Sequence, residues 1–306
     1  MTSPQPPCSP SAGAGPAGTP RAARLAVIGH PVAHSRSPAI HARFSAAEAY
    51  PVEYTRVEAP LDGFLATAVA FARGNFTAGV PAHGCNVTVP FKHEAFLACG
   101  RLTARAQRAQ AVNTIRFESG DPADWLGDNT DGAGLVRDIE RNAGIVLRGT
   151  RVLLLGAGGA AAGALDALLA AGPQELVVAN RTASRAQAMV QRYATAAAQA
   201  RVALAAATLD DPGTAFDVLV NATAASLQAH VPALPPRILR PGALALDMMY
   251  GAAAAPFLLW ARAQGAIARD GLGMLVEQAA EGWMTWFGVA PSTAQTLAAL
   301  RSEVDA

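Results

Sequence analysis

The stretch RVLLLGAGGAAAGALDALLAAG, residues 151–172, decides the fold of the second half of the chain. An apolar run of the length of a buried strand leads into a glycine-rich turn, and a helical stretch follows the turn. The turn has the form G-x-G-x-x-A at Gly156, Gly158 and Ala161. In this strand–turn–helix context the glycines let the backbone approach a pyrophosphate at the helix N-terminus. The pattern therefore predicts a dinucleotide site, with a tight turn that binds nothing as the alternative.

Strand-like and helical stretches alternate on both sides of this motif. Apolar β-type runs occur at residues 24–29, 52–59, 84–89 and 111–117 before it and at 175–181, 217–223 and 243–250 after it. The alternation predicts an α/β chain of two domains, each with a mostly parallel sheet flanked by helices. We expect a first domain over residues 24–130, a Rossmann-type domain over residues 131–270 and C-terminal helices over residues 271–306. The cleft between the domains is the expected working site.

The composition narrows the classes of protein and of partner. Residues 1–23 are mainly Pro, Ala, Gly and Ser and lack an apolar signal segment, which predicts a disordered tail. The 306 residues are 51% hydrophobic, and the net charge of +1 gives no reason to expect nucleic acid or anionic membrane as a partner. No apolar run is long enough to span a membrane. Cys8, Cys85 and Cys99 form no disulfide framework and the histidines form no metal-ligand motif, so we expect a cytoplasmic protein without a metal.

The strand that follows the glycine turn ends in ANRTASRA, residues 179–186, and this segment bears on the choice of cofactor. An NAD site carries an acidic residue about 20 residues after the turn, where it accepts the ribose 2′-hydroxyl. Asn180 stands there instead, followed by Arg181 and Arg185, which we expect on one helix face. Cations at a helix N-terminus are unfavourable unless an anion binds there. The segment therefore predicts binding of the 2′-phosphate of NADP, with a solvated basic helix start as the alternative.

Lys92, in GCNVTVPFKHEAF, is the only lysine of the chain, and the other 23 of the 24 basic residues are arginine. Lysine can release a proton near neutral pH where its surroundings favour the neutral form, whereas arginine cannot. Pro90 ends the preceding strand, so we expect Lys92 in the first turn of a helix, where the helix dipole disfavours a cation. That position is poor for a structural lysine and good for a proton donor. A single surface lysine is the alternative.

Polar residues of other loops are expected to surround such a lysine. Each alone is typical of a cap or turn, but together with the lysine they form a set of mainly uncharged donors and acceptors that suits a small hydroxylated acid. They are Ser35 and Ser37 in HSRSP, Asn86 and Thr88 in NVTV, Asn113 in AVNT, and Asp128, Asn129, Thr130 and Asp131 in GDNTDG.

At these residues the chain resembles the shikimate dehydrogenase family. The matching segments are GHPVAHSRSPAIHARF, GCNVTVPFKHEAF, AVNTI, GDNTDGAG, LLLGAGGAA, ANRTASRA, NAT, DMMYG and GLGMLVEQA, in the family's order from about residue 24 to about residue 290. NVTVPFK and DNTDG are the most specific of them. NATAASL, residues 221–227, departs from the family because it lacks the Ser-then-Gly often seen after NAT.

The resemblance implies reversible NADPH-dependent reduction of 3-dehydroshikimate to shikimate, on the route to chorismate and the aromatic amino acids. It implies that Lys92 and Asp131 are the catalytic pair and also contact the substrate. The other substrate-binding residues would be Ser35, Ser37 and Tyr250 at the carboxylate and Asn86, Thr88, Asn113 and Gln278 at the ring hydroxyls. The NADP site would comprise Gly156, Ala157, Gly158, Gly159, Ala160, Ala161, Asn180, Arg181, Thr182 and Arg185, with Met248 and Gly271 beside the nicotinamide. The last helices would return to the substrate-binding first domain and bring Gln278 with them.

Three alternatives share some of these features. A quinate/shikimate dehydrogenase would be favoured by turnover of quinate or by equal use of NAD, and Arg181 and Arg185 argue against the latter. A non-catalytic ligand-binding relative would be expected to lose Lys92 or Asp131. A reductase with a Tyr/Lys/Ser triad needs a YxxxK motif, which the chain lacks. The sequence is compatible with a monomer or a homodimer.

Overall fold

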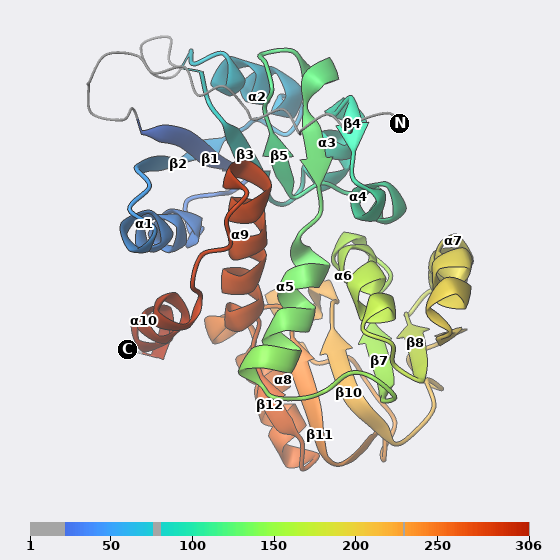
Figure 1. The fold of residues 1–306 in the computed structure, drawn as a ribbon. Coiled ribbons are helices and arrows are strands. Elements are labelled where there is room, and N and C mark those ends of the chain that lie inside the picture. Colours follow the sequence, from blue (N-terminus) through green and yellow to red (C-terminus); the bar gives the residue numbers. More distant parts are fainter. Residues whose placement is uncertain (1–21, 76–80, 229, 306) are drawn as a thin grey trace, which may run out of the picture.

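The computed structural model describes residues 22–75, 81–228 and 230–305. The predicted tail lies outside the described residues up to residue 21, and Ala23 already belongs to the first strand, β1, rather than to a tail. Figure 1 shows two α/β units. Each is built around a sheet of six strands. The prediction of a two-domain α/β fold is therefore confirmed.

The sheet of the first unit has the strand order β2-β1-β3-β5-β6-β4. Its strands are β1 (Ala23–Gly29), β2 (Val52–Glu58), β3 (Gly84–Val87), β4 (Arg101–Leu102), β5 (Thr114–Arg116) and β6 (Leu126–Asp128). β1 runs parallel to β2 and β3, whereas β5 runs antiparallel to both of its neighbours, β3 and β6. This sheet is therefore mixed.

Four helices accompany this sheet, namely α1 (Ser37–Ala47), α2 (Phe64–Ala72), α3 (Lys92–Ala98) and α4 (Ala104–Ala109). Phe64, Phe71, Phe91 and Trp125 form the aromatic centre of its core, and each is at most 1% exposed. α3 begins at Lys92 itself, which confirms that the only lysine lies in the first turn of a helix.

The sheet of the second unit is parallel throughout and has the order β12-β11-β10-β7-β8-β9. Its strands are β7 (Arg151–Leu155), β8 (Glu175–Ala179), β9 (Ala203–Ala207), β10 (Phe216–Asn221), β11 (Leu239–Asp247) and β12 (Ile267–Arg269). Counted in chain order this is 3-2-1-4-5-6, the Rossmann arrangement, in which ligands bind at the carboxyl ends of the strands where the order reverses. That point lies between β7 and β10.

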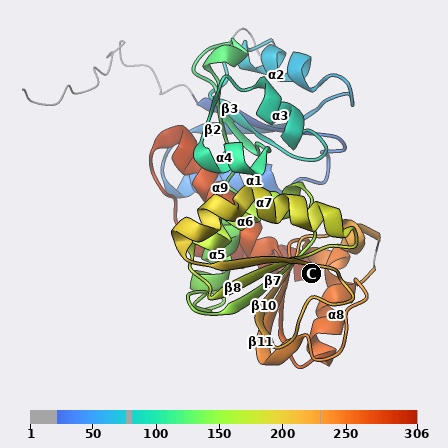
Figure 2. The same cartoon turned by 90° about the vertical axis from the view of Figure 1, so that its right-hand side faces the viewer.

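Helices cover both faces of the second sheet. They are α5 (Asp131–Arg137), which continues as a π-helical turn over Asp138–Asn142, α6 (Gly159–Ala170), α7 (Ala183–Ala200) and α8 (Ala255–Ala263). Val152 and Leu154 of β7 pack toward α5, α6 and α7, whereas Leu153 and Leu155 pack toward α8, as strand alternation requires. Figure 2 shows α7 and α8 on opposite sides of this sheet.

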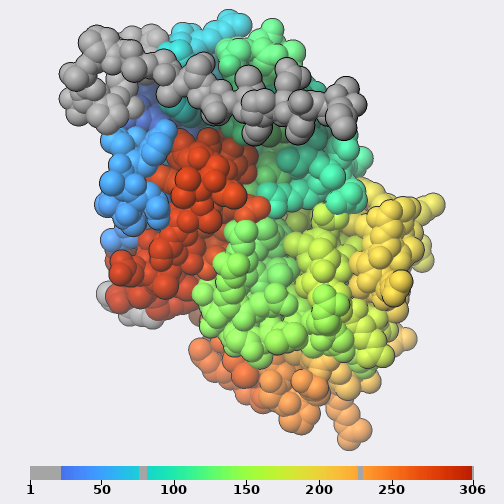
Figure 3. All heavy atoms as spheres, in the orientation of Figure 1, coloured from blue at the N-terminus to red at the C-terminus, as the bar shows by residue number. Residues whose placement is uncertain are grey.

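The last two helices, α9 (Leu272–Phe287) and α10 (Ala294–Asp305), return to the first unit. Val276 and Trp283 of α9 share a buried cluster with Ile40 and Phe44 of α1. Trp286 Nε1 donates a hydrogen bond of 2.9 Å to the carbonyl oxygen of Ile115 in β5. Figure 3 shows this C-terminal segment, in red, lying against the blue segment that contains α1. The expected return of the C-terminal helices is therefore confirmed.

Candidate active site

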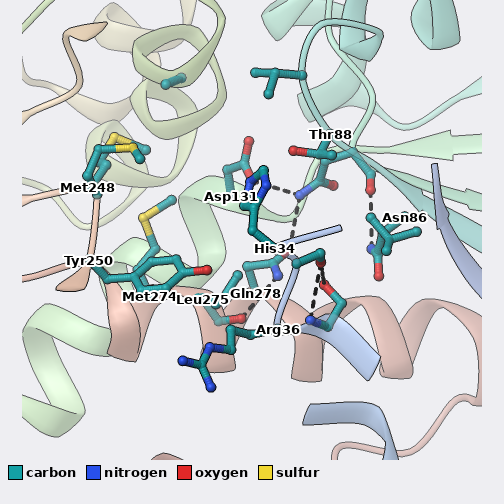
Figure 4. A pocket seen from close by; sticks show the side chains of 18 of the residues that line it. His34, Arg36, Asn86, Thr88, Asp131, Met248, Tyr250, Met274, Leu275 and Gln278 are labelled. Carbon is teal, nitrogen blue, oxygen red and sulfur yellow. Dashed lines mark hydrogen bonds between the residues drawn. The ribbon is translucent and has the colours of Figure 1, made fainter. Parts of the chain in front are cut away.

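A cavity of about 710 Å³ opens between the two units, and Figure 4 shows side chains from both of them pointing into it. It brings together every residue predicted to bind substrate, together with three of the twelve predicted to bind cofactor. The substrate set is Ser35, Ser37, Asn86, Thr88, Lys92, Asn113, Asp131, Tyr250 and Gln278, and the cofactor residues are Ala160, Met248 and Gly271. Segments far apart in the sequence thus form one site.

Lys92 and Asp131 form an ion pair in this cavity. Lys92 Nζ donates to Asp131 Oδ2 at 2.6 Å, and the two side chains are 25% and 8% exposed. Each residue is the first of its helix, Lys92 in α3 and Asp131 in α5. The pair therefore joins the two units at the point where the chain passes from one to the other.

Asn113 fixes the other oxygen of this carboxylate. Its Nδ2 donates to Asp131 Oδ1 at 2.7 Å and lies 3.2 Å from Gln278 Oε1, while its Oδ1 accepts from the backbone N–H of Thr130 at 2.9 Å. Gln278 Nε2 in turn donates to the carbonyl oxygen of Leu275. These bonds determine which way both amides point, so Asp131 presents a fixed acceptor to the cavity.

Ser35 and Ser37 lie together at the start of α1. Their hydroxyls are 3.2 Å apart, and Ser35 Oγ accepts from the backbone N–H of Ser37. The guanidinium of Arg56 binds the carbonyl oxygen of Ser35 at 2.6 and 3.0 Å and so holds the loop from behind. Arg36, between the two serines, also lines the cavity. Two hydroxyls and one cation are therefore presented side by side.

Tyr54 of β2 is a residue that the sequence reasoning missed. Its phenol donates to Asn86 Oδ1 at 2.7 Å, while Asn86 Nδ2 donates to the carbonyl oxygen of Asn113 and to Thr114 Oγ1. The ring of His41 stacks on that of Tyr54 at 4.3 Å. The hydrogen bond from Tyr54 thus fixes the orientation of Asn86. In the sequence, the signal for this role was a tyrosine, with its polar hydroxyl, within a predicted strand.

The glycine turn stands at the carboxyl end of β7. Gly156 has φ +106°, which favours glycine, and a Cβ added at Gly158 or Gly159 would meet nothing within 4 Å. Gly158 is the N-cap of α6 and has no side chain to cap it, so the first N–H groups of the helix receive no hydrogen bond from an N-cap side chain. The turn therefore has the room and the free donors that a phosphate requires.

Nine of the predicted cofactor residues lie outside the cavity lining. They are Gly156, Ala157, Gly158, Gly159 and Ala161 of the turn and its helix, and Asn180, Arg181, Thr182 and Arg185 beside the turn. β7 and β8 pair with Leu155 opposite Ala179, which places the segments after the two strands side by side. The expectation that both arginines share a helix face is wrong. α7 begins at Ala183, so Arg181 lies in the bend before the helix and only Arg185 lies on it. Both arginines are exposed.

Asp128 does not join the cavity, in contrast to Asp131 three residues later. Arg105 binds both of its oxygens, at 2.7 and 2.5 Å, and also binds Glu281 of α9 at 2.8 Å. Burial by itself would raise the pKa of Asp128, but the hydrogen bonds and charge of Arg105 more than offset this and bring it below the usual value. Asn129 is likewise structural, since its amide donates to the carbonyl oxygen of Ala111.

Among the described residues, no group of three or more His, Cys, Asp or Glu side chains is placed to hold a metal ion. No helix in the described part of the chain has both the length and the apolar character needed to cross a membrane.

Comparisons with known proteins agree with this geometry. Family models match three parts of the chain, described as shikimate dehydrogenase substrate binding domain (residues 27–115), shikimate/quinate 5-dehydrogenase (residues 139–231) and shikimate 5′-dehydrogenase C-terminal domain (residues 271–301). A relative from Methylibium petroleiphilum named shikimate dehydrogenase (NADP(+)) is 58% identical, over 92% of this chain and 95% of its own.

Solved structures show the same fold. An Ael1 enzyme from Pseudomonas putida is 44% identical with a TM-score of 0.82, over 91% of this chain and 98% of its own. A shikimate 5-dehydrogenase from Thermus thermophilus, in complex with NADP(H) and shikimate, is 30% identical with a TM-score of 0.75, over 92% of this chain and 99% of its own. By sequence and by structure, the chain belongs to the shikimate dehydrogenase family.

Proposed function

We propose that this protein catalyses the reversible NADP(H)-dependent reduction of 3-dehydroshikimate to shikimate. The observation that carries the proposal is the Lys92–Asp131 pair, which stands among uncharged donors and acceptors between the serine loop and the cofactor side of the cavity. The relative named shikimate dehydrogenase (NADP(+)) and the Thermus structure in complex with both ligands support it.

The residues at the carboxyl edge of the second sheet fit a dinucleotide. The open turn at Gly158 and Gly159 has room for the pyrophosphate, and the free N–H groups at the start of α6 are suited to bind it. Arg181 and Arg185, with Asn180 in place of an acid, would bind the 2′-phosphate. NADPH, when bound, supplies the hydride for reduction of the carbonyl.

Lys92 is the proton donor in this proposal. In reduction its Nζ gives a proton to the carbonyl oxygen as negative charge develops there, and in oxidation it takes the proton back. Asp131 holds the ammonium in place through Oδ2 and accepts a hydrogen bond from the hydroxyl that forms at the reduced carbonyl. Asn113 keeps the carboxylate of Asp131 from rotating. Lys92 thus supplies the proton, and Asp131 orients the ammonium toward the reacting oxygen.

The other polar residues of the cavity would bind the carboxylate and the ring hydroxyls of the substrate. Ser35, Ser37 and Tyr250 would bind the carboxylate, and Thr88 and Gln278 would bind ring hydroxyls together with Asn86 and Asn113. Both N–H groups of Asn86 are used inside the protein, and its Oδ1 already accepts from Tyr54, so the second lone pair of Oδ1 is what remains for a substrate hydroxyl. An acceptor at that atom requires a hydroxyl donor on the ligand, as a polyhydroxylated ring provides.

We extend the proposal to the organisation of the chain. Residues 24–130 would bind the substrate, residues 131–270 the cofactor, and residues 271–306 would complete the substrate side. We also propose a cytoplasmic enzyme, either a monomer or a homodimer, without a nucleic-acid partner. The buried free thiols of Cys85 and Cys99 suit a reducing compartment.

One assay tests the function and separates the alternatives. NADP⁺ reduction is followed with shikimate and with quinate as substrates, and each assay is repeated with NAD⁺. The proposal expects efficient turnover of shikimate with NADP⁺ and poor turnover of the other combinations. Good turnover of quinate would favour the broader quinate/shikimate activity, and tight binding of shikimate without turnover would favour a non-catalytic relative.

A further inference from the structure

Arg36 provides the net charge of the cavity. Among the described side chains that line it, Lys92 and Arg36 are cations and Asp131 is the anion. Because Lys92 and Asp131 form a close pair, their charges largely cancel. The guanidinium of Arg36 is then the cation left to act on a ligand.

The charge of Arg36 lies in the loop that carries Ser35 and Ser37. It stands between Ser35 and Ser37, and Figure 4 shows its guanidinium on the Tyr250 side of the cavity, away from Asn86 and Thr88. Burial raises the pKa of the Tyr250 phenol, and the charge of Arg36 partly offsets that rise. The cation thus lines the same cavity as the three hydroxyls that the proposed function assigns to a carboxylate, on the side of Tyr250.

The partner of Arg36 holds it weakly. Arg36 Nη1 lies 3.5 Å from Glu303 Oε2 of α10, with the two side chains 38% and 40% exposed. Arg43 binds the other oxygen of Glu303 more closely, so Glu303 keeps a cation when Arg36 moves away. Exposed pairs of this kind contribute little, and exchange of Glu303 for a ligand carboxylate therefore costs little.

We propose that Arg36 is the specificity-determining residue for an acidic substrate. Its guanidinium would separate from Glu303 and pair with the substrate carboxylate, which Ser35 and Ser37 also bind. The inference rests on the proposed function and deepens it. The serine hydroxyls and Tyr250 can also donate to the carbonyl oxygen of an ester or amide, so they discriminate less against such ligands than a cation does. The guanidinium adds the preference for the ionised form.

The test compares shikimate with its methyl ester, which has the same ring and no charge. Arg36→Gln is expected to lower kcat/KM for shikimate roughly ten- to a hundredfold, mostly through KM, and to leave kcat/KM for the ester nearly unchanged. Arg36→Lys should keep part of the preference for the acid. Glu303→Gln should increase that preference, because it removes the anion that competes with the substrate.

Arg116→Gln is the matched control. Arg116 forms an exposed pair with Glu118 in which the side chains are 39% and 43% exposed, and it lies outside the cavity lining. The same charge is removed, so the control should keep the wild-type ratio of acid to ester. The side chain of Arg36 makes no capping bond to α1, and the thermal unfolding midpoint of Arg36→Gln should therefore match that of the wild type.

The possible outcomes are distinct. If the wild type oxidises shikimate but Arg36→Gln lowers activity on acid and ester equally, or leaves their ratio unchanged, Arg36 does not select for charge and this inference is wrong while the proposed function stands. If the wild type does not oxidise shikimate with NADP⁺, the proposed function fails, and the inference with it.

Discussion

Lys92 Nζ and Asp131 Oδ2 lie 2.6 Å apart, although each residue begins a helix that belongs to a different unit of the fold. The ion pair therefore depends on how the two units meet. Asn113 of the first unit, bonded to the other oxygen of Asp131, holds the same junction. The proposed catalytic pair is in place only when the units are assembled.

Substitution of Lys92 tests the proton transfer. Lys92→Ala is expected to lower kcat by about 10²–10⁴, the usual contribution of a general acid–base group, with a much smaller change in KM for shikimate. Lys92→Arg should fail as well, because a guanidinium keeps the charge but does not release a proton. Steady-state kinetics in both directions provide the measurement. Near-normal turnover by the arginine variant would contradict the assigned role.

Substitution of Arg181 tests the choice of cofactor. Arg181→Ala is expected to raise KM for NADP(H) roughly ten- to a hundredfold and to change KM for NAD(H) little, because NAD has no 2′-phosphate. Arg185→Ala should act in the same direction more weakly, and Asn180→Asp should shift preference further toward NAD. The assays require modest ionic strength, since salt screens exposed charges. An equal loss for both cofactors would mean that these residues do not read the phosphate.

A matched pair of glycines tests the contact between α5 and α9. A Cβ at Gly134 would lie 2.6 Å from the backbone nitrogen of Gln278, whereas a Cβ at Gly282 would meet its nearest atom at 3.5 Å. Gly134→Ala is therefore expected to cost about 1–3 kcal/mol of unfolding free energy and to raise KM by displacing Gln278. Gly282→Ala, also within a helix, should be neutral or stabilise by up to about 1 kcal/mol. Urea unfolding of both variants provides the comparison, and equal effects would contradict the close approach.

His41 should make stability depend on pH. Burial lowers the pKa of His41 from 6.5 to about 3, with a smaller opposing effect from Asn86. Below about pH 6.5 the unfolded chain therefore binds a proton that the folded protein does not, and the unfolding free energy falls by up to about 1.4 kcal/mol per pH unit until about pH 3. Above pH 6.5 this contribution is constant.

His41→Phe keeps an aromatic ring in the stack and removes the titrating group, so its unfolding free energy should fall less steeply from pH 6.5 to 4. His230→Gln, at an exposed position, is the control and should follow the wild-type curve. Urea melts at a series of pH values provide the measurement. Parallel curves for wild type and His41→Phe would show that His41 is not the source of the slope.

Tyr54 offers a test of the substrate side. Tyr54→Phe removes the donor to Asn86 Oδ1 and is expected to raise KM for shikimate roughly two- to tenfold with little change in kcat. Tyr50→Phe is the control, since Tyr50 is 43% exposed and lies outside the cavity lining. A fall in kcat without a change in KM would argue against a role in orienting Asn86.

The features that could be predicted from the sequence are those that local patterns determine. The glycine turn, its flanking strands and the helix that begins at Lys92 each depend on neighbouring residues. β9 was missed because its sequence, ALAAA, favours a helix, and it becomes a strand only by pairing with β8 at the sheet edge. Arg36 and Tyr54 could not be singled out from the sequence, because their contacts are with Glu303 and Asn86, which lie far away in the chain.

The return of α9 to the first unit has a consequence for the order in which the protein is made. A ribosome releases the N-terminal unit first, yet Ile40 and Phe44 of α1 are buried against Val276 and Trp283 of α9. The first unit to emerge therefore waits with an apolar face exposed while the whole second unit is synthesised. A chain that stops before residue 272 would keep that face uncovered, so aggregation and proteolysis of nascent or truncated chains should centre on α1 rather than on the Rossmann unit.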